Sequence, residues 1–311
     1  MPTLLDYRRR IRSVKSTQQI TRAMKFVAAA KLRRAQEGVF AARPYAREIL
    51  RVLHSAAARV ESTVHPLLER RPEERVLVVV LTGDRSLCGA FNSNAIRRAS
   101  IFMRENSSKK LEVLAVGKKG RNALKREGWA LAGEYVNVSG NVNFDIAKEI
   151  ASKIAELYES GKVDAVYTVY NEFKNVLTQR LRTEKLLPID PAILAESEGP
   201  ETKSAPQSRE EESLPHDLSP AGQSMVEYIY EEPITEIFRH LVPRYLQSEV
   251  FRILLESEAA EWAARMTAMD SATRNAAELI DKVTLQMNKT RQAAITKELI
   301  EIVSGAASAT S

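Results

Sequence analysis

The sequence is 311 residues long, with 44% hydrophobic residues, 28% charged residues and a formal net charge of +6 at pH 7. This is typical of a globular protein with enough chain for one good core plus extensions. Cys88 is the only cysteine, so no intramolecular disulfide can form and a reducing compartment is expected. No apolar run approaches the roughly 18 residues of a membrane-spanning helix, and no signal-peptide core follows Met1. Any membrane association is therefore expected to be peripheral and to go through a partner.

Positive charge is concentrated at the amino terminus. Residues 1 to 37 carry ten basic side chains and only two acidic ones, Asp6 and Glu37, so this arm alone has a larger surplus than the whole chain. Such a stripe attracts polyanions, and a nucleic acid is the first candidate. The alternative is that the stripe is the solvated face of a helix.

Residues 3 to 58 are predicted to form a long helix. Gly and Pro are absent from Thr3 to Glu37, and the segment is rich in residues that favour helices. Its apolar residues do not keep one heptad register, which predicts a drifting stripe that packs against another helix rather than a symmetric zipper. Pro44 is expected to kink or interrupt the helix. The stripe comprises Ile11, Val14, Ile20, Met24, Val27 and Leu32.

Residues 75 to 190 alternate between strand and helix patterns. The apolar run from Val76 to Leu81, bounded by Gly83, is typical of a strand buried on both faces. Strands that alternate with helices imply right-handed crossovers and a largely parallel, Rossmann-like sheet. Further strands are predicted at 111 to 116, 129 to 138 and 163 to 170, an antiparallel edge at 177 to 187, and helices at 92 to 106, 121 to 127 and 144 to 160.

A second long helix is predicted near the carboxyl terminus. Between Pro243 and Gly305 the chain has no Gly or Pro, and at 1.5 Å per residue such a helix would be roughly 90 Å long. Gly305 is its expected end. Small and apolar residues recur along it at steps of three and four, which marks a face for a partner helix. They are Ala272, Ala276, Leu279, Val283, Met287, Thr290 and Ala294.

The two long helices are expected to pair, because helical stability in water comes chiefly from packing of the apolar face. The predicted fold class is α/β, with a long antiparallel coiled coil of the N- and C-terminal helices and a central Rossmann-like domain with a mostly parallel sheet. A stretch crowded with Glu, Ser and Pro predicts a disordered linker between them. The expected boundaries are 1–58 for the first shaft helix, 59–194 for the Rossmann-like domain, 195–223 for the linker, and 224–311 for a foot segment and the second shaft helix.

The loop from Thr82 to Asn92 follows the first strand and precedes a helix, where α/β folds often bind phosphates. It fits neither the Walker pattern nor Gly-x-Gly-x-x-Gly, which disfavours a nucleotide site. Cys88 has no local partner for nucleophilic chemistry, and the four His and one Cys lack metal-ligand spacing. We therefore predict no catalytic site, no cofactor and no metal. A nucleotide-dependent α/β enzyme with helical arms stays an alternative.

Four segments spread over nearly the whole chain carry a specific pattern: Ser13 to Leu32, Asp84 to Asn92, Ala264 to Met269 and Thr290 to Ser308. In this order they resemble the γ subunit of F-type ATP synthases, the rotating shaft of that machine. The chain departs from the family pattern at Ser86 and Ala90, which replace glycines in the central loop.

The resemblance implies a central rotor stalk that is not itself an enzyme. A proton-driven membrane ring would turn the shaft inside a ring of three α and three β subunits, and the rotor angle would change the nucleotide affinities of the catalytic sites on β. It further implies an ε subunit and the c-ring as partners, and a peripheral place on the cytoplasmic face of a bacterial inner membrane. The basic arm would then face acidic and polar segments of the surrounding ring, which leaves nucleic-acid binding as the minor alternative.

The resemblance also assigns partner-binding residues by motif position. Arg291, Gln292 and Thr296 match residues that hydrogen-bond a catch loop of the β subunit; the alternative is that they are solvated polar positions on a helix. Met24 and Lys25 match the region that faces the levers of β, and the alternative for Met24 is packing in the seam between the helices.

A third group matches the foot that rests on the membrane ring. It comprises Tyr228, Tyr230 and Glu231, and the alternative is that the two tyrosines are core residues beside the sheet.

Overall fold

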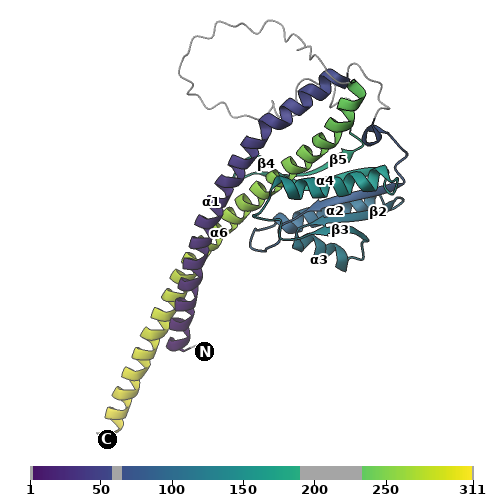
Figure 1. Ribbon diagram of the computed structural model, residues 1–311. Coiled ribbons are helices and arrows are strands. Elements are labelled where there is room, and N and C mark those ends of the chain that lie inside the picture. Colours follow the sequence, from purple (N-terminus) through teal and green to yellow (C-terminus); the bar gives the residue numbers. More distant parts are fainter. Residues whose placement is uncertain (1–2, 58–64, 190–232, 310–311) are drawn as a thin grey trace, which may run out of the picture.

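The computed structural model describes residues 3–57, 65–189 and 233–309. Two long helices, α1 (Leu4–Ala57) and α6 (Ile234–Ala309), lie side by side as a shaft, and one α/β domain packs against part of it (Figure 1). This confirms the predicted fold class. The predicted linker at 195–223 lies outside the described residues.

The two shaft helices run antiparallel, as predicted. Lys25 Nζ lies 2.5 Å from Asp270 Oδ1, and the hydroxyl oxygens of Thr21 and Thr273 are 2.8 Å apart, so residue numbers rise along α1 as they fall along α6. Nearer the α/β domain the seam is built from four alanines around Leu32 and Trp262, and the small residues let the helix backbones approach closely. This cluster comprises Ala28, Leu32, Ala35, Ala259, Trp262 and Ala263.

The seam of α1 differs from the predicted drifting stripe. Ile20 and Val27 are 57% and 56% exposed and lie outside the seam, so the prediction was wrong for them. One set of buried and half-buried positions instead keeps strict heptad spacing, with Met24 and Ala29 half-buried beside it. A search for apolar residues misses this set because polar residues occupy its central positions. The seam comprises Ile11, Val14, Gln18, Thr21, Lys25, Ala28, Leu32 and Ala35.

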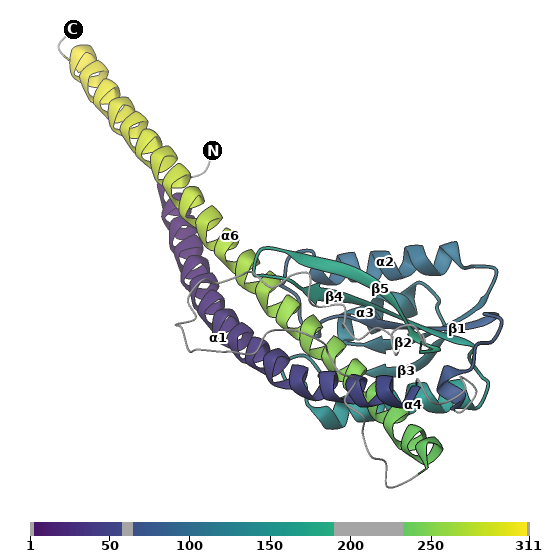
Figure 2. The same ribbon diagram turned by 90° about the horizontal axis from the view of Figure 1, so that it is seen from above.

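The course of α1 at Pro44 and the end of α6 also differ from expectation. α1 passes through Pro44 without interruption and bends around α6 (Figure 2). Pro44 is exposed, on the side where water can satisfy the carbonyl group that loses its hydrogen bond. α6 begins at Ile234, includes Pro243 and continues past Gly305 to Ala309, so the expected end at Gly305 was wrong. A glycine inside a helix costs only about 1 kcal/mol relative to alanine, and alanines follow it here.

The α/β domain contains one five-stranded sheet in the order β3-β2-β1-β4-β5. The first four strands are parallel and β5 runs antiparallel to β4 at the edge, as predicted. β1 lies in the centre, and the residues from Val76 to Leu81 are at most 3% exposed, which confirms a strand buried on both faces. The strands are β1 (Arg75–Leu81), β2 (Lys110–Val116), β3 (Leu131–Tyr135), β4 (Ala165–Phe173) and β5 (Gln179–Leu187).

Helices cover both faces of the sheet. α2 (Phe91–Glu105) and α3 (Lys118–Arg126) pack on the face reached by Val76, Val78 and Val80. The alternate residues of β1 point to the other face, where α4 (Phe144–Glu159), a short 3-10 helix (Pro66–Leu68) and the first half of α6 complete the larger core. α6 is therefore both a layer of the domain and one half of the shaft.

Candidate partner-binding site

The end of α6 extends beyond the start of α1 (Figures 1 and 2). α1 begins at Leu4, which the register of the seam places close to residue 290 of α6. From Arg291 to Ala309, no other helix of the described chain lies beside α6. From Arg291 to Ser304 every residue is exposed except the half-buried Ala294.

Arg291, Gln292 and Thr296 lie on this overhang and all three are exposed. Gln292 and Thr296 are four residues apart and so share one face of the helix, with Arg291 next to it. Within the described residues their side chains make no ion pair or hydrogen bond. The guanidinium group, the amide and the hydroxyl together offer donors and acceptors that a partner can use.

The overhang also carries exposed apolar side chains, which the sequence analysis did not single out. Their exposed fractions run from 50% at Ile295 to 67% at Val303, although isolated soluble helices rarely expose so many large apolar residues together. Their i, i+3 and i+4 spacing was visible in the sequence, but only the register of the coiled coil shows that α1 does not cover them. The group comprises Ile295, Leu299, Ile300, Ile302 and Val303.

The amino-terminal half of α1 presents a second exposed surface. Thr3 and Asp6 cap the helix, with the Thr3 amide and hydroxyl donating to the Asp6 carboxylate at 2.9 and 2.8 Å. These bonds lower the pKa of Asp6, so the carboxylate stays ionised near the basic cluster. The predicted basic residues of the arm are exposed here, beside the exposed Ile20, Phe26 and Val27. The basic group comprises Arg8, Arg9, Arg10, Arg12, Lys15 and Arg22.

The remaining predicted site residues are not grouped with the overhang. Met24 is half-buried at the edge of the seam. Lys25 is held in its ion pair with Asp270, and its side chain is 39% exposed. The predicted foot residues Tyr228, Tyr230 and Glu231 lie outside the described residues.

The loop after β1 is closed by the chain itself. The Asp84 carboxylate accepts hydrogen bonds from the backbone amides of Lys118, Asn137 and Ser139 at 2.9 to 3.0 Å. The Thr82 hydroxyl accepts another from the amide of Gly120 at 2.8 Å. Amides at the start of α3 that would otherwise be free to bind a phosphate are thus already bonded to side chains of this protein.

Buried charges then fix this loop to the shaft. Arg265 of α6 donates to the Ser86 carbonyl at 2.5 Å and to Glu261, which also accepts a hydrogen bond from Ser139. Cys88 is 1% exposed beside them, and burial raises the pKa of its thiol. The cysteine is therefore a packed residue rather than an exposed nucleophile.

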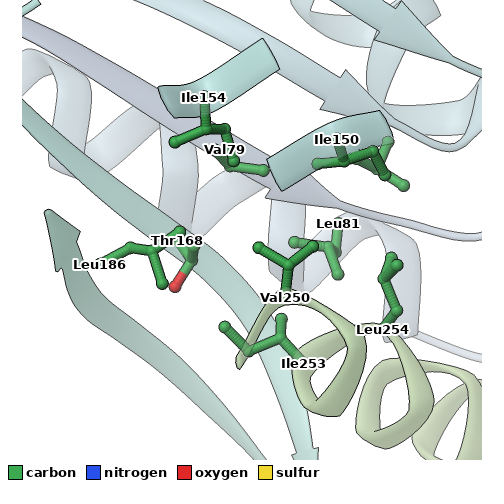
Figure 3. A pocket seen from close by; sticks show the side chains of 10 residues that line it. Val79, Leu81, Ile150, Ile154, Thr168, Leu186, Val250, Ile253 and Leu254 are labelled. Atoms are coloured by element: carbon green, nitrogen blue, oxygen red, sulfur yellow. The ribbon is translucent and has the colours of Figure 1, made fainter. Parts of the chain in front are cut away.

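Two small cavities of the described chain are far below the several hundred Å³ of a typical ligand pocket. One cavity of about 10 Å³ lies between the sheet, α4 and α6, with apolar walls that include Val79, Ile150 and Ile253 (Figure 3). A second, of about 20 Å³, is lined by Glu258 and Glu261 among others and has room for one water molecule. The described residues contain no cluster of metal ligands and no helix that is long and apolar enough to cross a membrane.

Comparison with known proteins extends over the shaft and the domain together. Residues 3–309 match the family described as ATP synthase. The ATP synthase gamma chain of Solibacter usitatus is 47% identical over 99% of this chain and 100% of its own length. That of Pelotomaculum thermopropionicum is 46% identical over 99% of both chains. A chain of the central stalk and c-ring structure of Tetrahymena thermophila mitochondrial ATP synthase has a TM-score of 0.58 and 27% identity, and the match covers 81% of this chain and 99% of that chain.

Proposed function

The chain belongs to the family of ATP synthase γ subunits, and we propose that its shaft turns inside a ring of α and β subunits and transmits rotation of the membrane ring to the catalytic sites of β. The observation that carries this proposal is the overhang of α6, a helix of about five turns on which polar and apolar side chains are exposed together. Such a helix is suited to being surrounded closely by other protein chains that contact it on several faces.

The finer assignments of partners follow from the family. We place one copy of this chain with three α and three β subunits, with an ε subunit and the c-ring at the domain end, on the cytoplasmic face of a bacterial inner membrane. The catalytic sites would lie on β, and this chain would take part as a non-catalytic subunit. The exposed basic arm supports the proposal, because it suits a ring lined with acidic and polar groups.

On the overhang, Arg291, Gln292 and Thr296 are the residues that we assign to the catch loop of β. A guanidinium group offers a planar fork of donors to carboxylate and carbonyl oxygens, and the amide adds a donor and an acceptor. Met24, with the exposed Phe26 and Val27 on its flank, is assigned to the levers of β.

The energy that such contacts must supply is modest. A conformational equilibrium moves from 1:99 to 99:1 when the difference in contact energy between its two states is about 5.5 kcal/mol. Charge-assisted hydrogen bonds contribute about 1.5 to 3 kcal/mol each, so about two to four contacts made at one rotor angle and lost at the next are sufficient. The shaft is asymmetric, with the domain on one side and the overhang at the tip, and each β subunit would meet a different face.

Co-purification tests this proposal. The chain is co-expressed with α and β subunits and the complex is isolated through a tag on β. We expect one copy of this chain per three of each partner, and a truncation after Thr290 should reduce its retention. Recovery of the α and β ring without this chain would contradict the proposal.

Binding of nucleic acid by the exposed basic arm is the second reading. It predicts an affinity for polynucleotides that falls steeply with salt and survives at physiological ionic strength. The rotor assignment predicts weak, nonspecific binding only, and titration of the full chain with a duplex at two salt concentrations separates the two.

A further inference from the structure

We propose that Thr21, Lys25, Asp270 and Thr273 form a polar layer that sets the register of the two shaft helices beyond the α/β domain. Lys25, which the family resemblance assigns to a contact with β, is then a positioning residue within the shaft. Along the seam, the layer lies farther from the α/β domain than the small-residue cluster does. At the layer, α1 and α6 have no third element between them.

The apolar part of the seam discriminates poorly between registers. Ala28 and Ala35 of α1 face a part of α6 that contains Ala259 and Ala263. A slide of one heptad, roughly 10 Å along the axis, brings Ala28 opposite Ala259 in one direction, so small residues meet again there. Packing of these alanines alone therefore leaves the register weakly determined.

The polar layer has one register only. When the helices slide by one heptad, Lys25 comes opposite Ala263 in one direction and Ala277 in the other. In both cases the ion pair is lost, and Asp270 meets Leu32 or Gln18 instead. A polar layer in the seam of a coiled coil is a well-attested way to specify how helices pair.

The hydroxyl pair adds a second constraint. Thr21 is only 9% exposed, and its hydroxyl oxygen lies 2.8 Å from that of Thr273 and 3.0 Å from the carbonyl of Gln18. The Thr273 hydroxyl lies 2.7 Å from the carbonyl of Met269. Each hydroxyl has one proton, and either threonine can be the donor between the two oxygens. This bond forms only while the two threonines are opposite each other.

The charges at the layer are compatible with a permanent ion pair. The hydrogen bond from Lys25 lowers the pKa of Asp270, and the second oxygen of Asp270 lies 3.4 Å from Arg274. No other titratable side chain of the described chain contacts the pair. The Asp270 carboxylate therefore stays ionised at neutral pH.

The position of the layer explains why the shaft needs it. The α/β domain still approaches α6 at Ala268. The backbone of Gly89 is so near that a Cβ atom added to this glycine would lie 3.9 Å from the Ala268 Cβ. Figure 2 shows the paired helices projecting away from the domain beyond this region. If the chain acts as the proposed rotor, twisting a two-stranded coil makes its helices slide past each other, and the layer resists that sliding.

Distances between spin labels on the full chain test the proposal. One pair of labels, at Ser16→Cys and Asn275→Cys, flanks the layer, and a control pair, at Arg34→Cys and Thr267→Cys, lies nearer the domain; all four positions are exposed. Buried Cys88 is kept. Lys25→Asp opposes two carboxylates, Lys25→Ala removes the pair without repulsion, and Lys25→Asp with Asp270→Lys restores it reversed.

In the parent chain we expect one narrow distance between the labels that flank the layer. Both single variants should broaden this distance or shift it by up to roughly 10 Å, and the charge reversal should restore it, while the distance of the control pair stays unchanged. An unchanged flanking distance in the single variants, no restoration by the reversal, or an equal change in the control pair would each overturn the proposal.

A functional readout separates this inference from the proposed function. In the assembled complex, protons pumped per ATP hydrolysed should fall in Lys25→Asp and recover in the charge reversal. If no complex forms even with the parent chain, the rotor assignment fails, while the spin-label distances still decide the role of the layer.

Discussion

The double variant Arg291→Ala, Gln292→Ala should separate the function of the overhang from its stability. Both side chains are exposed, and within the described residues they make no contact that folding would lose. The thermal unfolding of the isolated full chain should therefore stay within about 0.5 kcal/mol of the parent. In the assembled complex, one charge-assisted and one neutral hydrogen bond to β would disappear, together about 2 to 4 kcal/mol.

A loss of that size at one rotor angle changes an equilibrium by at least roughly tenfold, since each 1.4 kcal/mol is a factor of ten. We expect the rate of ATP hydrolysis and the rate of proton pumping to fall by a comparable factor in reconstituted complexes of matched subunit composition. Arg104→Ala, an exposed change on α2 away from the shaft, is the control and should leave both rates unchanged. Parent-like rates in the double variant would refute the assignment to the catch loop.

Three further outcomes are expected. Ala28→Trp should destabilise the full chain by about 1 to 3 kcal/mol because Ala28 is 0% exposed. Ala23→Trp, at an exposed position, should not. Equal melting temperatures of the two variants would contradict the placement of Ala28 in the seam. Burial opposes ionisation of Glu73, but hydrogen bonds from two lysines outweigh it and lower its pKa from 4.5 to about 2. The stabilisation by ionised Glu73 should be complete above pH 4.5 and lost as the pH falls toward 2. In Glu73→Gln the free energy of unfolding should therefore fall less on acidification than in the parent. An equal fall in both proteins would contradict this prediction. Deleting residues 305–311 should still permit assembly, since this end offers little apolar area, and failure to assemble would show that it is needed.

The sheet was predictable because its signals are local. An unbroken apolar run such as Val76 to Leu81 has few alternatives to a buried strand, and the alternation with helices determines a parallel order. The pairing of the two long helices also followed from the sequence, since each is too long to be stable without a partner.

The seam was not predictable from apolar periodicity. Gln18, Thr21 and Lys25 occupy seam positions that a search for apolar residues passes over, and Ile20 and Val27 are apolar yet exposed. Polar seam residues become recognisable only with their partners on the other helix, which lie about 250 positions away in the chain. Local pattern cannot supply such a pairing.

The candidate site likewise has features that the sequence can predict and features that it cannot. Motif position singled out Arg291, Gln292 and Thr296 as candidates, and they are exposed on the overhang. Their binding to β stays a prediction. The apolar group around Ile295 to Val303 was missed, because whether an apolar helix face is covered depends on where the partner helix ends. Closure of the loop after β1 by Asp84 was equally hidden, since its three amide donors come from two segments that lie 34 to 55 positions further along the chain.

Direct observation of rotation tests the central claim most closely. A bead is attached through Arg104→Cys on the exposed surface of α2, and the α and β ring is fixed to a glass surface through tags on β. On addition of ATP we expect the bead to turn in one direction in steps of one third of a revolution, as a shaft within three β subunits requires. A bead that stays fixed or only fluctuates, in a complex that hydrolyses ATP at the full rate, would contradict the account.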